Sequence, residues 1–318
     1  MSESDFIVES FDALGTSCQI ILYKSTDSKL AISTAHSYIR QMDKVASFYR
    51  SDSELTTLNV ARSETVSVSE QLLELLELYD WAYCESKSKI DAAVGHQLVE
   101  LVAPYNSILY EFAVQNAHDA ETTFGDVKID SKNNLITRPV GLLIDFGGLG
   151  KSFIADNLAI KIIEAGGGGV LVNLGGDIRV EGEVPQGGWL IKVTNDLSLS
   201  SDAPGQLISI VLGGVATSSR LTRRWIDRAG NDREHIVLGD KSPIKCDYTS
   251  VTVAASSATL ANFYTLFALL SQDEAPAMLA RFGLPALVRT ADGIGIGLGG
   301  WPSNELSNKG QSSLVGAR

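Results

Sequence analysis

The chain has 318 residues, of which 44% are hydrophobic and 20% are charged, enough for one large or two closely associated globular domains. Its 26 basic and 38 acidic residues give a net charge of −12, which argues against binding to nucleic acid or to an anionic membrane. Cys18, Cys84 and Cys246 form neither a zinc motif nor a disulfide framework. No signal peptide and no membrane-spanning run is visible, so we expect a cytoplasmic protein.

The first part of the chain predicts strands and amphipathic helices. Phe6–Tyr23 alternates between apolar and polar residues and ends in an apolar run, which indicates a strand. Apolar residues at helical spacing predict helices over Lys29–Arg50 and Ser69–Glu85, and the polar residues at 51–53 are typical of a helix cap. Val127–Asp130 is predicted to be a further short strand.

The stretch from Leu142 to Glu181 carries the strongest pattern in the sequence. A short apolar run, Leu142–Ile144, predicts a strand, and the glycine-rich turn after it leads to Lys151, where helical spacing begins. Glycines at 166–169 end this helix, and two buried strands joined by a turn follow over 170–180. The order of strand, glycine turn, lysine, helix and strand suits a phosphorylated ligand.

The physical reason for this interpretation lies in the backbone. Glycines allow N–H groups to approach a phosphate closely, a helix N-terminus adds partial positive charge, and Lys151 adds a full one. The glycine spacing matches neither the P-loop nor the dinucleotide fingerprint, which disfavours a nicotinamide dehydrogenase. A tight strand-to-helix connection with an exposed lysine explains the same residues, so these residues alone leave both interpretations open.

The last third predicts further strands and one long helix. The predicted elements are strands at Trp189–Val193 and Leu207–Leu212, a polar turn with Thr217 and Ser218, a strand at Ser250–Ala254, a helix at Ala258–Leu270 and a strand around Ile294–Leu298. The glycine- and serine-rich end, 301–318, is expected to be a flexible tail.

Several motifs of this chain, taken in order, are similar to one known family. The central residues Asp145-Phe-Gly-Gly-Leu-Gly-Lys151, then Asp156, then Asn173-Leu-Gly-Gly-Asp177, resemble the signature of the ApbE family of FAD:protein FMN transferases. Gly150 and Ser152 stand where that family usually has alanine and glycine. Weaker matches occur in the family's order at 13–16, 47–59, 89–99, 213–219 and 250–270.

The resemblance implies an α+β fold related to the T-fold, with antiparallel sheets flanked by helices and a flavin cleft between two halves. It implies a single domain, or two intimate subdomains at about 1–140 and 141–300. Exported members of the family carry a lipobox cysteine near the start, and none is visible here, which again favours the cytoplasm.

The resemblance also implies a function: transfer of FMN from FAD to a threonine of a target protein. The implied partners are FAD, a flavin-accepting protein and Mg²⁺. Lys151 and His235 are the implied catalytic residues. The implied cofactor-binding residues are Asn59, Asp91, Gly147, Gly148, Lys151, Asp156, Gly175, Gly176, Asp177, Thr217 and Ser218. The implied metal positions are the main-chain carbonyl of Gly148, Asn262 and Thr265.

The metal positions depart from the family pattern. Asn262 stands where the family has aspartate, Leu266 stands where it has threonine, and Thr265 is one residue early, about 100° around the helix. Leu238 and Gly239 replace an Asp-Pro pair. An amide brings no charge to a metal, so tight Mg²⁺ binding is disfavoured. Two hypotheses follow: a transferase with weakened or altered metal dependence, or a catalytically weak or inactive FAD-binding homologue that acts as a flavin carrier or sensor.

Overall fold

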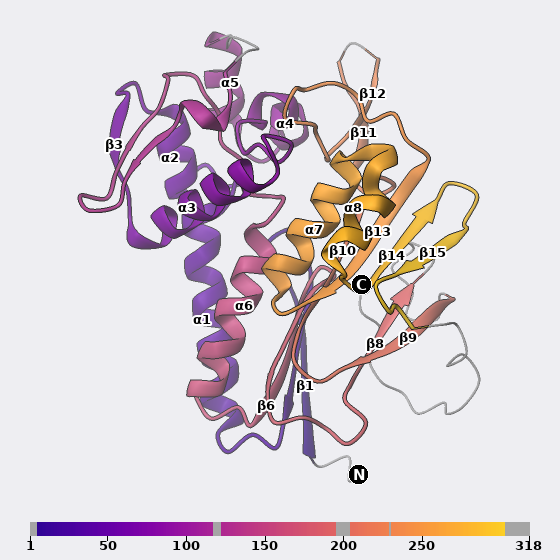
Figure 1. The fold of residues 1–318 in the computed structure, drawn as a ribbon. Coiled ribbons are helices and arrows are strands. Elements are labelled where there is room, and N and C mark those ends of the chain that lie inside the picture. Colours follow the sequence, from indigo (N-terminus) through magenta and orange to yellow (C-terminus); the bar gives the residue numbers. More distant parts are fainter. Residues whose placement is uncertain (1–4, 117–121, 195–203, 229, 303–318) are drawn as a thin grey trace. The chain divides into compact units, whose positions relative to one another are not determined.

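A computed structural model describes residues 5–116, 122–194, 204–228 and 230–302 (Figure 1). The chain divides into two compact units, each assembled from segments far apart in the sequence. The sheet unit comprises the chain up to Ile39, Lys151–Leu221 and the chain from Cys246 on, and the helical unit comprises Arg40–Gly150 and Thr222–Lys245. The glycine-rich turn therefore ends one unit, and Lys151 begins the next segment of the other.

The sheet unit is built on one large antiparallel sheet. Its strand order is β1-β2-β6-β7-β10-β13-β14-β15, and every neighbouring pair is antiparallel. The strands are β1 (Phe6–Ala13), β2 (Thr16–Tyr23), β6 (Gly169–Leu174), β7 (Asp177–Gly182), β10 (Gly213–Ser219), β13 (Tyr248–Ala255), β14 (Ala286–Thr290) and β15 (Gly295–Leu298). Helices accompany this sheet, so the predicted α+β class with antiparallel sheets is confirmed.

Different elements pack on the two faces of this sheet. On one face, strands β8 (Trp189–Thr194) and β9 (Gly205–Ile210) form a hairpin whose Trp189, Ile191 and Ile208 pack against sheet residues such as Val215. Neighbouring side chains of a strand point to opposite faces. A Cβ on Gly214, next to Val215, would lie 2.3 Å from the backbone nitrogen of Ala258, so α7 (Ala258–Leu270) covers the other face. Helices α6 (Gly150–Glu164) and α8 (Ala275–Phe282) complete the unit.

Two predictions in the sheet unit need correction. The single strand predicted over Phe6–Tyr23 is a hairpin, because Leu14 and Gly15 adopt positive φ angles of 53° and 68° and turn the chain. Thr217 and Ser218 lie inside β10 and not in a turn. The turn prediction was wrong because the polar residues of a half-exposed strand resemble those of a loop.

The helical unit consists mainly of short helices with two small sheets. Its elements are α2 (Glu54–Val60), α3 (Glu70–Glu85), α4 (Gly95–Val102), α5 (Ser107–Gln115), β3 (Thr65–Ser67), β4 (Lys128–Asp130), β5 (Leu135–Thr137), β11 (Arg224–Ile226) and β12 (Asp232–Glu234). The long helix α1 (Ser28–Ala46) contains the boundary between the units and ends before the predicted Arg50. Among the described helices, none is long and apolar enough to cross a bilayer.

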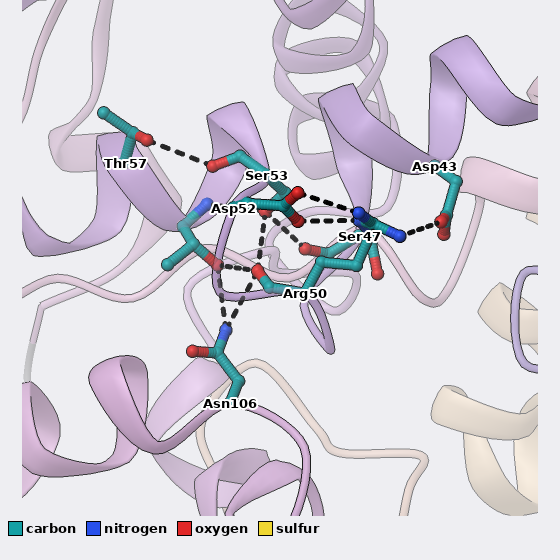
Figure 2. A network of polar contacts seen from close by, with 8 residues as sticks. Asp43, Ser47, Arg50, Asp52, Ser53, Thr57 and Asn106 are labelled. Atoms are coloured by element: carbon teal, nitrogen blue, oxygen red, sulfur yellow. Dashed lines mark hydrogen bonds and ion pairs between the residues drawn. The ribbon is translucent and has the colours of Figure 1, made fainter.

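The cap predicted at 51–53 is confirmed as the start of α2. The hydroxyl of Ser53 accepts a hydrogen bond from the Thr56 backbone N–H at 3.0 Å, and the carboxylate of Asp52 binds the guanidinium of Arg50 (Figure 2). Ser53 is fully buried, and its hydroxyl also lies 2.6 Å from the carbonyl oxygen of Ser47. The capping serine therefore fixes α2 to the chain that enters it.

The strand predicted at Leu142–Ile144 is absent, although the run is buried as expected. Among the described residues, no strand pairs with it. Instead, the side-chain amide of Asn59 bonds both backbone groups of Ile144, and the Gly95 N–H donates to the carbonyl of Leu143. The prediction was wrong because an apolar run shows burial and extension but not which groups satisfy its backbone.

Candidate functional site

The glycine-rich turn is a tight connection between the buried run and α6. The carboxylate of Asp145 accepts a hydrogen bond from the Gly147 N–H at 2.8 Å, and the Gly150 N–H donates to the carbonyl of Phe146 at 2.8 Å to begin α6. A Cβ on Gly147 would lie 2.8 Å from the Asp145 carboxylate, so a side chain at 147 would displace it. Gly147 is exposed and Gly148 is half-buried, which leaves this turn open to solvent at its middle.

Lys151 and the β6–β7 turn come together in the sheet unit. The Lys151 ammonium, in the first turn of α6, lies 3.7 Å from the carboxylate of Asp177, the first residue of β7. Gly175 and Gly176 turn the chain before Asp177 with φ angles of 68° and 97°. A Cβ on Gly175 would lie 2.4 Å from the hydroxyl of Thr16, so only glycine fits there. The structure thus brings four of the residues predicted from sequence to one place.

Asp156 has a different setting. Its two carboxylate oxygens accept hydrogen bonds from the backbone N–H groups of Ala258 and Thr259 at 2.8 and 2.9 Å, and from the Thr259 hydroxyl at 2.6 Å. The guanidinium of Arg179 lies 3.6 Å away. Asp156 therefore joins α6 to the N-terminus of α7, where a negative charge is favoured by the helix dipole.

A cluster of neutral side chains, called the neutral cluster below, contains two of the three positions implied for a metal, Asn262 and Thr265. It consists of Ser152, Ser218, Asn262 and Thr265. The Asn262 side-chain oxygen lies 3.3 Å from the Ser218 hydroxyl and 3.2 Å from that of Thr265, and its NH₂ group donates to the Ser152 hydroxyl at 3.2 Å. The Ser218 and Thr265 hydroxyls lie 2.7 Å apart. Each member therefore bonds to other members of the cluster.

The neutral cluster does not fit Mg²⁺. That ion prefers carboxylate, phosphate and water oxygens, whereas this cluster offers uncharged amide and hydroxyl groups that already bond to one another. Within the part of the chain that the structure describes, no group of three or more His, Cys, Asp or Glu side chains could hold a metal ion.

Asn59 and Asp91 lie in the helical unit and are buried. The Asn59 amide donates to the carbonyl of Ile144 and accepts from its N–H, both at 2.8 Å. One Asp91 carboxylate oxygen accepts from the N–H groups of Ala93 and Phe124 at 2.7 and 3.0 Å, while burial raises the pKa of this carboxyl. Asn59 thus holds Ile144, the residue directly before Asp145. Asp91 holds the N–H of Ala93, next to Ala92, whose carbonyl accepts a hydrogen bond from the Asp145 N–H.

Thr217 and His235 complete the set of predicted site residues. Thr217 is exposed on β10, and its hydroxyl lies 2.9 Å from that of Thr252 on the paired strand β13. His235 follows directly after β12 in the helical unit and is half-buried. Thr217 thus presents a hydroxyl at the surface of the sheet unit, as a ligand contact would require.

Two residues of the helical unit, one at the turn and one at the end of α2, have roles that were not expected from the sequence. Tyr79 falls in the leucine-rich stripe of α3, yet its hydroxyl accepts a hydrogen bond from the Leu149 N–H at 2.7 Å. Arg138 is 1% exposed and donates to the backbone carbonyls of Leu58, Asn59 and Ala61. A buried tyrosine usually needs a hydrogen-bond partner, which is the one signal that could have drawn attention to Tyr79.

Comparisons with known proteins show which chains are similar to this one. The model of the ApbE family matches residues 14–288. A protein of Klebsiella pneumoniae named FAD:protein FMN transferase is 24% identical over 296 residues, which is 90% of each chain. Two solved structures have similar folds. The ApbE protein of Thermotoga maritima has a TM-score of 0.77 at 20% identity, covering 92% of this chain and 97% of its own. The flavin transferase ApbE of Vibrio cholerae has a TM-score of 0.73 at 23% identity, with the same coverage.

Proposed function

Because the chain belongs to the ApbE family, we propose that it is an FAD:protein FMN transferase, which moves FMN from FAD to a threonine of a target protein. The observation that carries this proposal is the gathering of Lys151, Gly175, Gly176 and Asp177 at the start of α6. These residues come from both halves of the family signature. A helix N-terminus with a lysine in its first turn provides positive charge for a pyrophosphate.

The proposed reaction divides FAD at its pyrophosphate. The threonine Oγ forms a bond to the phosphorus of the FMN half, the bond from that phosphorus to the bridging oxygen breaks, AMP leaves with the bridging oxygen, and the threonine proton is released. Lys151 is proposed to neutralise charge that develops on the phosphate oxygens. His235 is proposed as the second catalytic residue from its place in the sequence pattern.

Apart from Ser218, which belongs to the neutral cluster, the remaining cofactor-binding residues fall into two groups in this proposal. Gly147, Gly148 and Thr217 are proposed to contact FAD, because they are exposed or half-buried. Asn59, Asp91 and Asp156 are proposed to hold the site in shape, because their side chains bond to the protein backbone. We derive no step through Mg²⁺, since the neutral cluster does not fit this ion.

The experiment that tests the function is mass spectrometry of flavinylated peptides. Purified protein, FAD and an extract of the source cells are incubated with Mg²⁺ and, separately, with a chelator. We expect tryptic peptides in which a threonine carries FMN, together with AMP release. If the purified protein binds FAD but produces no FMN-bearing peptide in the extract, this result would instead support the inactive FAD carrier. The relatives that are named as flavin transferases favour the transferase.

We also propose that the protein works in the reducing cytoplasm. All three cysteines are free in the structure, with Cys18 buried and Cys84 exposed. Free thiols are typical of reducing compartments. A disulfide between any two of the three cysteines in protein from the native host would contradict this location.

The cysteines allow a direct prediction of reactivity. Burial raises the pKa of the Cys18 thiol to about 11, so at pH 8 only about 0.1% of it is thiolate, the reactive form. In native protein at pH 8, iodoacetamide should therefore modify Cys84 and leave Cys18 intact, and Cys18 should react only after unfolding. Peptide mass spectrometry after timed alkylation measures both. Equal rates at Cys18 and Cys84 in native protein would show that Cys18 is accessible.

A further inference from the structure

Two side chains from different helices hold the two ends of the glycine turn. At the first end, the Asn59 side chain of α2 bonds both the N–H and the carbonyl of Ile144. At the second end, the Tyr79 hydroxyl of α3 accepts from the N–H of Leu149. Asp145 and the glycines lie between these points. The turn is therefore fixed from outside at both ends, within one unit of the protein.

Asn59 replaces the neighbouring strand that Ile144 lacks. Its amide offers one donor and one acceptor, each 2.8 Å from its partner, which is the pairing that an opposite residue in an antiparallel sheet would make. Asn59 is fully buried, and its own carbonyl accepts from the guanidinium of Arg138. Arg138 bonds the last carbonyls of α2 and so fixes the helix end that carries Asn59.

Tyr79 is aimed at the turn by its packing. It is 2% exposed, and its ring lies 5.1 Å from that of Phe146, which is buried inside the turn. The ring contact and the hydroxyl bond to Leu149 therefore act on residues on either side of the glycines. Glycine-rich segments have many accessible conformations, so a fixed shape needs anchors outside the segment. A loop held in its binding conformation loses less freedom when a ligand binds.

We propose that Tyr79, together with Asn59, is a positioning residue that sets the glycine turn for the FAD pyrophosphate. The proposal rests on the proposed function, because the turn must bind the nucleotide for its shape to matter. Tyr79 itself acts through Leu149 and contacts no reacting atom. Its loss should therefore weaken FAD binding and loosen the turn, with no greater effect on folding than the loss of a similar hydroxyl elsewhere on α3.

The helix α3 supplies a matched control for this test. Tyr83, on the same helix, donates its hydroxyl to the Thr123 hydroxyl at 3.1 Å and makes no bond to the turn. Tyr79→Phe and Tyr83→Phe each remove one hydroxyl and keep the ring. We expect similar small decreases in Tm for both variants. Only Tyr79→Phe should raise the Kd for FAD, by about three- to tenfold, the loss expected from one hydrogen bond.

A second measurement does not depend on the ligand. Amide hydrogen exchange of residues 144–150 in the free protein should be about three- to tenfold faster in Tyr79→Phe than in Tyr83→Phe. Equal exchange and equal FAD affinity in the two variants would overturn the positioning role while leaving the proposed function intact. Wild-type protein that does not bind FAD would overturn both.

Asn59 is tested in the same way against another buried asparagine. The Asn106 amide donates to the carbonyl oxygen of Arg50 (Figure 2). It also donates to the carbonyl oxygen of Phe48 and to the Thr56 hydroxyl, and it makes no bond to the turn. Asn59→Ala should raise the Kd for FAD at least about tenfold, because two hydrogen bonds are lost. Asn106→Ala should change it by less than about twofold at similar loss of stability. If Asn59→Ala proves unfolded, the tyrosine pair decides the proposal alone.

Discussion

Replacing Lys151 with alanine is expected to lower the affinity for FAD about tenfold to a hundredfold, because a charge-assisted contact to phosphate contributes about 1.5–3 kcal/mol. The side chain is 20% exposed in the first turn of α6, where its charge adds to the positive end of the helix dipole. Isothermal titration calorimetry with FAD measures the effect. An unchanged Kd in the folded variant would remove Lys151 from the site.

Lys151 also forms an ion pair with Asp177, so the effect of its replacement on FAD binding must be measured separately from its effect on the stability of the fold. The Asp177 side chain is 6% exposed, so removing Lys151 should also cost about 1–3 kcal/mol of unfolding free energy, between the values for exposed and fully buried pairs. Lys151→Arg keeps the charge and should lose much less stability than Lys151→Ala. Thermal unfolding without ligand reports this cost, and calorimetry well below Tm reports binding alone.

Helix α6 offers a matched control at its other end. The exposed Lys161 lies over the ring of Tyr38, with its ammonium 5.1 Å from the ring centroid. Lys161→Ala removes the same charge from the same helix, far along the chain from the glycine turn. Its Kd for FAD should stay within about twofold of wild type. A loss equal to that of Lys151→Ala would mean that net charge, and not the position of Lys151, governs affinity.

Elements with a strong local period could be predicted from the sequence. The helix at Ala258–Leu270 and the strands around Gly175-Gly176 follow their apolar patterns, since periodicity reports which face is buried. The strand prediction at Leu142–Ile144 was wrong because the backbone of this run is bonded by the side chain of Asn59 and by the N–H of Gly95, the first residue of α4. No local pattern of the run itself contains that information.

In the candidate site, too, the features with a local pattern could be predicted and those that depend on distant residues could not. Lys151 and the glycines are visible as a local pattern, and the structure keeps Lys151 beside Asp177. The roles of Asp156 and Tyr79 could not be predicted, because their hydrogen-bond partners are 102 and 70 residues away in the chain. Thr265 was expected to point away from the aligned ligand position. Its hydroxyl nevertheless lies 3.2 Å from the side-chain oxygen of Asn262, at the i, i+3 spacing that brings helical neighbours together.

The neutral cluster leads to the second large expected effect. In wild-type protein, FMN transfer should be slow and should differ by less than about threefold between Mg²⁺ and chelator, because Asn262 supplies no charge. Asn262→Asp places a carboxylate of nearly the same shape among the hydroxyls of Ser152, Ser218 and Thr265. Hydrogen bonds from these hydroxyls favour the ionised form, so the variant should fold and carry the charge.

The Asn262→Asp variant is therefore expected to gain an Mg²⁺-dependent component of FMN release or acceptor flavinylation, at least about tenfold above its rate in chelator. Adding Leu266→Thr restores the spacing of the family pattern, but it should add little, because the Thr265 hydroxyl already lies in the cluster. Asn157→Asp is the matched control, since it adds the same charge to α6, where Asn157 bonds the carbonyl of Phe153. It should leave the metal dependence unchanged. A wild-type enzyme that transfers FMN rapidly and stops in chelator would contradict this account, and would require that Mg²⁺ be held by groups outside the neutral cluster.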